Sequence, residues 1–195
     1  ASAELAAEKG PFTLFDSERY LAGKFVTMLP EDIRALIARN GIRNSHLTSI
    51  APTGTISMCA DNVSGGIEPV FAYQVERAIG TPDGVVMEKI EDYGAKFLGV
   101  RGRLADDVSA DEHVAVLVAA QALVDSAVSK TVNMDGKKMG WDAFKNIYMT
   151  AYRGGAKGCA TFNKSGKRVA LLADAAPAPG AACHIDPLTG QKECA

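Results

Sequence analysis

A short run of small and hydroxyl-bearing residues, Thr53-Gly54-Thr55-Ile56-Ser57, follows Pro52 and carries the clearest chemistry in the chain. The segment before it is expected to be a strand. A strand that leads through a glycine turn into a helix presents several backbone N–H groups, which together with Thr and Ser hydroxyls suit a phosphate. The run is not a Walker A loop, because the Gly-Lys-Ser/Thr ending is missing. A turn capped by its own hydroxyls is the alternative that the residues leave open.

The four cysteines, Cys59, Cys159, Cys183 and Cys194, form no CxxC pair and no Cys/His cluster with zinc-finger spacing. A structural zinc site is therefore not expected, and no residue is assigned as a metal ligand. Cys59 and Cys159 have small or apolar neighbours, so both are expected to be small buried residues. Cys183 and Cys194 lie on a glycine- and proline-bearing tail, where accessible thiols could exchange disulfides. Two surface cysteines without a redox role are the alternative.

Four other polar residues have ordinary structural interpretations. His46 is expected to be structural, with a substrate contact as the alternative. His113, in the first turns of a helix, is expected to be solvated or to cap that helix. Lys130 is explained by the dipole at a helix C-terminus, although it could face a phosphate. Glu68 is interpreted as a charged turn residue in a motif whose glycines and proline shape the backbone.

The elements that must position these residues alternate between helix and strand, which predicts an α/β fold. Ser109 and Glu112 form the sequence signature of a capping box at a helix start. The pattern predicts helices over residues 3–9, 30–41, 85–97, 109–128 and 141–153, strands over 44–51 and 70–79, a turn at 81–84, and a short strand within 160–172. The tail, residues 173–195, is expected to be extended and mobile.

Composition is that of an ordinary globular protein, with 47% hydrophobic and 23% charged residues. The formal net charge of −2 gives no broad basic field, so neither nucleic acid nor an anionic membrane is an expected partner. No apolar run is long enough to span a bilayer. The first residues lack the pattern of a signal peptide, and a cytoplasmic location is expected.

Several blocks, in order along the chain, resemble class II (adenosylcobalamin-dependent) ribonucleotide reductases. Residues 44–57 (NSHLTSIAPTGTIS) and 62–69 (NVSGGIEP) are similar to the late-barrel signature of that family. Residues 124–133 (VDSAVSKTVN), with His113 and Gln121 before them, resemble its next helix and boundary. Residues 157–162 (KGCATF) resemble the segment that closes its catalytic domain. The resemblance covers most of the chain between residues 5 and 172.

This resemblance implies a fold and a site. Residues 1–172 would be the C-terminal portion of the ten-stranded α/β barrel of ribonucleotide reductases, followed by the cysteine-bearing tail. The loop Thr53, Gly54, Thr55, Ile56 and Ser57 would hold the substrate's phosphates, mostly through main-chain amides. Cys183 and Cys194 would be the redox shuttle pair, re-reduced by a thioredoxin-like protein. Adenosylcobalamin would be bound mainly by the remainder of the enzyme.

One family feature is missing from this sequence. The radical cysteine of the family sits in an Asn-x-Cys-x-Glu loop, and none of the four cysteines here has a glutamate two residues after it. The chain is therefore not expected to reduce ribonucleoside diphosphates alone. It would act with a larger reductase subunit that carries the radical cysteine, as a subunit of a split enzyme or a part of a longer one. A noncatalytic nucleotide- or phosphate-binding module and a thiol carrier are the alternatives.

Overall fold

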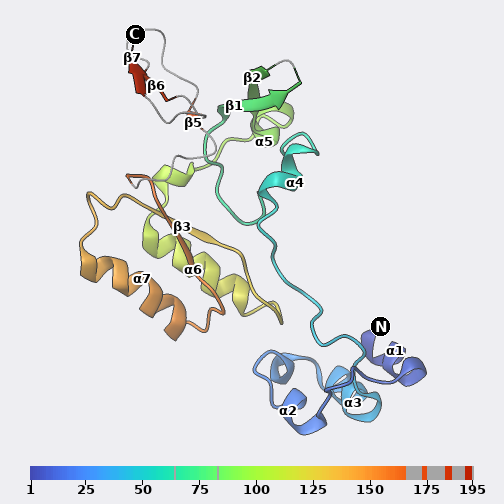
Figure 1. Cartoon of the computed structure of the whole chain (residues 1–195). Helices are drawn as coiled ribbons and strands as arrows, with labels where there is room; N and C mark the ends of the chain where they lie inside the picture. The colour runs from blue at the N-terminus through green and yellow to red at the C-terminus, as the bar shows by residue number, and fades with distance from the viewer. Residues whose placement is uncertain (64, 83, 166–172, 175–182, 186–191, 195) are drawn as a thin grey trace. The chain divides into compact units, whose positions relative to one another are not determined.

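The computed structural model describes residues 1–63, 65–82, 84–165, 173–174, 183–185 and 192–194 (Figure 1). Helices and strands are mixed along the chain, which confirms the predicted α/β class. The chain divides into two compact units. One comprises residues 1–71 and 102–168, and the other comprises residues 72–101 and 169–195. Within the described residues, no helix combines the length and the apolar character needed to cross a membrane.

Short helices open the first unit and pack around a small apolar core. They are α1 (Ser2–Lys9), α2 (Ser17–Leu21), the 3-10 helix η1 (Val26–Met28) and α3 (Glu31–Asn40). Gly10 and Gly41 end α1 and α3 with positive φ values that favour glycine. The core consists of buried Ala3, Ile37 and Ile42, against which Phe12, Phe15, Tyr20, Leu21, Leu29 and Leu36 pack.

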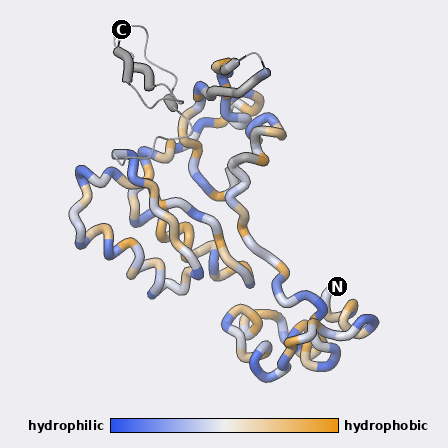
Figure 2. Tube along the Cα trace, in the orientation of Figure 1, coloured by the Kyte–Doolittle hydropathy of each residue, from blue (hydrophilic) through white to orange (hydrophobic). Residues whose placement is uncertain are grey.

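The larger core of this unit lies between two helices and a pair of parallel strands. The elements are η2 (Ala105–Asp107), α6 (Ala110–Gln121), β3 (Thr131–Met134), α7 (Trp141–Arg153) and β4 (Ala160–Asn163). Strand β3 runs parallel to β4 with Thr131 opposite Ala160, and α7 forms the crossover between them. The buried residues are Val114, Leu117, Val128, Val132, Ile147 and Ala151. Figure 2 shows apolar residues recurring along α6 and α7.

Helix α6 starts where the sequence predicts and ends earlier. The hydroxyl of Ser109 accepts from the amide of Glu112, and the Glu112 carboxylate accepts from the Ser109 amide, so the capping box is confirmed. The helix ends at Gln121, whose side-chain amide donates to the carbonyl of Ser126. The chain therefore turns before Val128, which becomes a buried core residue outside any helix.

The second unit contains a hairpin where part of a helix was expected. Strands β1 (Gln74–Thr81) and β2 (Gly84–Glu91) are antiparallel, with Thr81 opposite Gly84 across the predicted turn. The helix predicted over residues 85–97 is therefore wrong for its first half, and only α5 (Tyr93–Phe97) is helical. The short turn returns the chain onto β1, and β-branched residues such as Val86 and Ile90 favour a strand there.

The strands form three separate sheets within the described residues, in the orders β2-β1-β5, β3-β4 and β6-β7. The remaining strands are β5 (Ala173–Asp174), β6 (Cys183–Ile185) and β7 (Lys192–Cys194). These sheets form no closed barrel, because barrel closure requires every strand to pair on both sides. The barrel expectation is thus supported only as far as a mixed α/β fold. The predicted mobility of the tail concerns residues that mostly lie outside the described ones.

Candidate functional site

The run from Thr53 to Ser57 is a turn into a short helix, α4 (Gly54–Met58). Thr53 has a φ of 48°, a left-handed conformation that turns the chain sharply, and its side chain does not cap the helix. The amide of Ser57 donates to the carbonyl of Thr53 at 2.8 Å. This is the first bond of the helical ladder, so the amides of Gly54, Thr55 and Ile56 precede it and have no intrahelical acceptor. A phosphate-binding role for these amides stays a prediction.

The surroundings of the loop favour main-chain over side-chain contacts. Gly54 is exposed, and a Cβ added there would meet no atom within 4 Å. Ser57 is only 5% exposed, and its hydroxyl donates to the carbonyl of Gly54 at 2.8 Å, so this hydroxyl is engaged within the loop. Ile56 is 72% exposed. The side chain of Thr55 lies outside the described residues. The open space over Gly54 lets a ligand approach the backbone closely.

The segment before the loop is held by the carboxylate of Asp125. The amides of Leu47 and Thr48 donate to it at 2.7 and 2.6 Å, and the Thr48 hydroxyl donates at 3.0 Å. Burial raises the pKa of Asp125, but these hydrogen bonds outweigh burial and lower it overall. Ile50 then forms a single parallel bridge with Val128. The strand predicted over residues 44–51 is therefore reduced to one bridge, because the amides of Leu47 and Thr48 donate to a side chain and not to a neighbouring strand.

The turn after the loop packs against the loop's first residues through a glycine. Gly66 has a φ of 71°, and a Cβ placed on it would lie 2.9 Å from the carbonyl oxygen of Ala51 and 3.4 Å from Oγ1 of Thr53. Only a residue without a side chain fits this approach. The turn and the start of the loop are thus in direct backbone contact.

Three residues for which ordinary structural roles were expected, Glu68, His113 and Lys130, contact one another around a buried ammonium group. Lys130 is 2% exposed and His113 is fully buried. The Nζ atom of Lys130 lies 2.5 Å from Oε2 of Glu68 and 2.7 Å from Nδ1 of His113. Oε1 of Glu68 accepts from the amide of Thr131 at 2.5 Å. A solvated or capping role for His113 and a helix-dipole role for Lys130 are therefore wrong, whereas Glu68 has the structural role expected of its motif.

The partners of these three residues are far apart in sequence, which is why local patterns do not reveal them. A weak signal exists, since Lys130 alternates with Val128 and Val132, as a residue on the buried face of a strand would. Burial first, and then the Lys130 ammonium, lower the pKa of His113, against smaller opposing effects of Glu68 and the Ala105 carbonyl. The histidine is therefore neutral beside a buried lysine.

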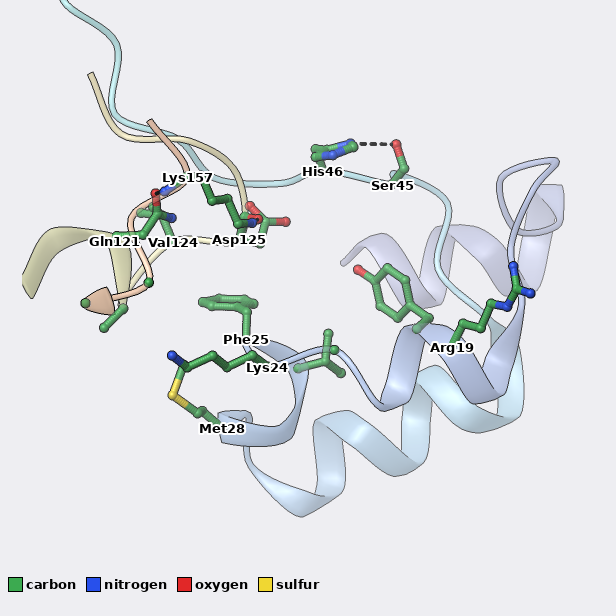
Figure 3. Close-up of a pocket in the computed structure, with 16 residues that line it drawn as sticks. Arg19, Lys24, Phe25, Met28, Ser45, His46, Gln121, Val124, Asp125 and Lys157 are labelled. Carbon is green, nitrogen blue, oxygen red and sulfur yellow. Dashed lines mark hydrogen bonds between the residues drawn. The ribbon is translucent and has the colours of Figure 1, made fainter. Parts of the chain in front are cut away.

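His46 borders a cavity instead of the loop. Its Nδ1 atom lies 3.0 Å from the Ser45 hydroxyl, and the two residues help to line a cavity of about 340 Å³ in the first unit (Figure 3). Phe25, Asp125 and Lys157 also line it. None of the described residues from 53 to 57 does. The structure therefore does not bring His46 and the loop together in one pocket.

The cysteines fall into two groups. Cys59 is exposed at the end of α4, so the prediction that it is buried is wrong, because α4 is too short to carry it into the core. Cys159 is half-buried and packs against the larger core, and burial raises the pKa of its thiol. Cys183 and Cys194 are directly opposite each other in the antiparallel pairing of β6 with β7. Their side chains lie outside the described residues, and their role as a shuttle pair stays a prediction.

Comparison with known proteins gives a consistent set of matches. The family model described as "Ribonucleotide reductase, barrel domain" matches residues 1–96 and 86–162. Vitamin B12-dependent ribonucleoside-diphosphate reductases of two Mycobacterium tuberculosis strains, CDC 1551 and H37Rv, are 31% identical over 92% of this chain and 27% of their own length. The ribonucleoside-diphosphate reductase subunit alpha of Buchnera aphidicola is 30% identical over 71% of this chain and 20% of its own length. The chain thus spans about a quarter of the length of these relatives.

Proposed function

The chain belongs to the ribonucleotide reductase barrel-domain family, and we propose that its Thr53–Ser57 loop binds the phosphates of a ribonucleoside diphosphate in a vitamin B12-dependent reductase. The observation that carries the proposal is the turn into α4, where three consecutive amides without intrahelical acceptors lie beside an open glycine. Such amides donate to phosphate oxygens without needing a nearby lysine. The names of the Mycobacterium tuberculosis relatives support both the diphosphate substrate and the cofactor.

The loop's task in this proposal is positioning. Amides fixed by the backbone hold the anionic end of the nucleotide, so the ribose is presented in one orientation to the reacting groups. The radical cysteine would lie outside these residues, since no cysteine of this sequence has the Asn-x-Cys-x-Glu context. It would be carried by a larger reductase subunit or by another part of a longer chain.

Cobalamin would supply the radical chemistry when bound. Among the described residues, no three metal-binding side chains gather in one place. The proposal places adenosylcobalamin mainly on the remainder of the enzyme.

Cys183 and Cys194 would return electrons to the site after each turnover. Residues directly opposite in an antiparallel pair have Cα atoms about 4.5–5.5 Å apart, within the range that a disulfide spans. The register of β6 with β7 supports this proposal. The reduced pair would give two electrons and two protons to an oxidised disulfide in the active site, and would itself become a disulfide. A thioredoxin-like protein would then reduce it.

The proposal is tested by reconstitution. The chain, the polypeptide that carries the radical cysteine, adenosylcobalamin and a dithiol are combined, and formation of deoxyribonucleoside diphosphate is measured. Gly54→Val should raise the KM for the ribonucleotide strongly, because the new side chain occupies the space where the phosphate approaches. Gly140→Val is the matched control, since a Cβ at Gly140 also meets no atom within 4 Å and this glycine is outside the loop.

Two outcomes would change the assignment. Full turnover without this chain would remove it from the enzyme, and equal KM values for Gly54→Val and Gly140→Val would remove the loop from the phosphate site. Nucleotide binding without any turnover under reconstitution would instead support a noncatalytic nucleotide-binding module. Turnover that is lost in Cys183→Ser with thioredoxin, but kept with a small dithiol, would support the shuttle pair.

A further inference from the structure

A buried lysine holds together two elements that flank the candidate phosphate loop. The Lys130 ammonium has three hydrogens and three acceptors: Oε2 of Glu68 at 2.5 Å, Nδ1 of His113 at 2.7 Å and the carbonyl of Thr131 at 2.9 Å. An ammonium group only donates, so Nδ1 of His113 must be the acceptor and the ring proton must be on Nε2. Every donor of the buried cation is thus satisfied, and the histidine is neutral.

Burying the Lys130 ammonium destabilises the fold unless all its hydrogen-bond partners are in place. The Lys130 side chain is fully buried, whereas the Glu68 side chain is 26% exposed. Removing one partner of such a pair leaves an uncompensated buried charge, while replacing both by apolar groups is often neutral for stability. The pair is therefore poorly explained by stability alone, and a positional role accounts for it better.

The position that the pair fixes is that of the turn after the loop. Both oxygens of Glu68 are engaged, one by Lys130 and the other by the amide of Thr131 at the start of β3. Glu68 follows Gly66 closely in sequence, and Gly66 lies against the carbonyl of Ala51 and the side chain of Thr53. A shift of the Glu68 carboxylate is thus transmitted along the turn to the first residues of the loop.

We propose that the Glu68–Lys130–His113 unit is a positioning device that sets the affinity of the Thr53–Ser57 loop for the substrate's phosphates without touching the substrate. This inference rests on the proposed function of the loop. Glu68 and Lys130 are positioning residues, and their loss displaces the loop while the groups that react remain in place.

The test is made in the complete holoenzyme with the variants Glu68→Ala, Lys130→Met and the double variant. Each single variant should raise the KM for the ribonucleoside diphosphate by about ten- to a hundredfold, the penalty of a small misplacement of binding groups, and should change kcat much less. Inhibition by inorganic pyrophosphate should weaken in parallel, whereas inhibition by the unphosphorylated nucleoside should stay the same. The double variant should be no worse than either single variant, because the two residues act as one unit.

Val132→Ala is the matched control, because Val132 is fully buried on β3, two residues after Lys130. It should lower the melting temperature without changing the KM. If Glu68→Ala does not fold, because it leaves the buried Lys130 ammonium without its carboxylate, the same comparison is made with Lys130→Met, since the Glu68 carboxylate that remains is partly exposed. A KM that is unchanged in Glu68→Ala, or that rises equally in Val132→Ala, overturns the inference. If Gly54→Val raises the KM and Glu68→Ala does not, only the positioning role fails; if Gly54→Val has no effect, the proposed function fails with it.

Discussion

Replacing Gly66 by alanine separates the backbone cost of a left-handed residue from the cost of crowding the loop. Gly66 has a φ of 71°, and an added Cβ would lie 2.9 Å from the Ala51 carbonyl oxygen. Gly10 provides a control in the same unit, because it has a similar φ of 77° and a Cβ there meets no atom within 4 Å. Both variants therefore place an alanine at positive φ, and they differ in the contact that its Cβ makes.

The expected magnitudes follow from these two terms. An alanine held at the positive φ and extended ψ of Gly10 costs about 1–3 kcal/mol, which should be the whole loss of unfolding free energy for Gly10→Ala. Gly66→Ala should lose about 1–3 kcal/mol more, the usual cost of forcing an extra methyl group into a packed position. Relief of the clash must move Ala51 or the turn, and either movement displaces Thr53.

Two assays read these effects. Urea denaturation followed by circular dichroism gives the free energies of unfolding of the chain. Steady-state kinetics of the holoenzyme give the KM for the ribonucleotide, which should rise about tenfold or more in Gly66→Ala and stay constant in Gly10→Ala. Equal destabilisation of the two variants would refute the reasoning about close approach. A normal KM in a clearly destabilised Gly66→Ala would separate the turn from the loop.

Three further predictions concern the supports of the site. Burial and Lys130 lower the pKa of His113 from 6.5. Below about pH 6.5, His113 is therefore protonated in the unfolded chain and neutral in the folded chain. The free energy of unfolding should therefore fall as the pH is lowered from 7 to 5.5, and His113→Gln should flatten that slope in urea titrations; an unchanged slope would mean that other groups produce it. Asp125→Ala should cost about 2–4 kcal/mol in urea unfolding, since it leaves hydrogen bonds to a charged acceptor unmade, whereas a loss near zero would contradict the hold on Thr48. Ser109→Ala should cost about 1 kcal/mol by loss of its cap, measurable as a lower thermal midpoint.

The elements that local sequence specifies were predictable. Capping residues, helical spacing and a tight turn each act within a few residues, so α1, α3, the start of α6, α7 and the β1–β2 turn were confirmed. The helix expected over residues 85–97 was wrong because pairing with β1 decides its first half. The strand expected over residues 44–51 was reduced to one bridge because the distant Asp125 carboxylate accepts from the amides of Leu47 and Thr48. In both cases the residues that determine the secondary structure are distant in sequence, so the local sequence pattern does not contain them.

For the polar residues of the site, too, local sequence does not reveal partners that are distant in the chain. Local sequence marks Thr53–Ser57, because its glycine and hydroxyls follow an extended segment directly. It does not mark Lys130, whose acceptors come from Glu68 and His113, 62 and 17 positions away. A charged residue is exposed by default, so its burial is known only when the structure supplies all its partners.

Both supports of the loop come from the short stretch between α6 and β3, and this determines how the loop responds to change. Asp125 holds the backbone before the loop at Leu47 and Thr48, and Lys130 holds the turn after it through Glu68. The stretch itself bridges to Ile50 through Val128. A displacement of residues 125–130 therefore moves both ends of the loop together and preserves its shape, whereas loss of one support distorts it. Phosphate affinity should consequently be more sensitive to a single broken anchor than to a general loosening of the α6–β3 connection.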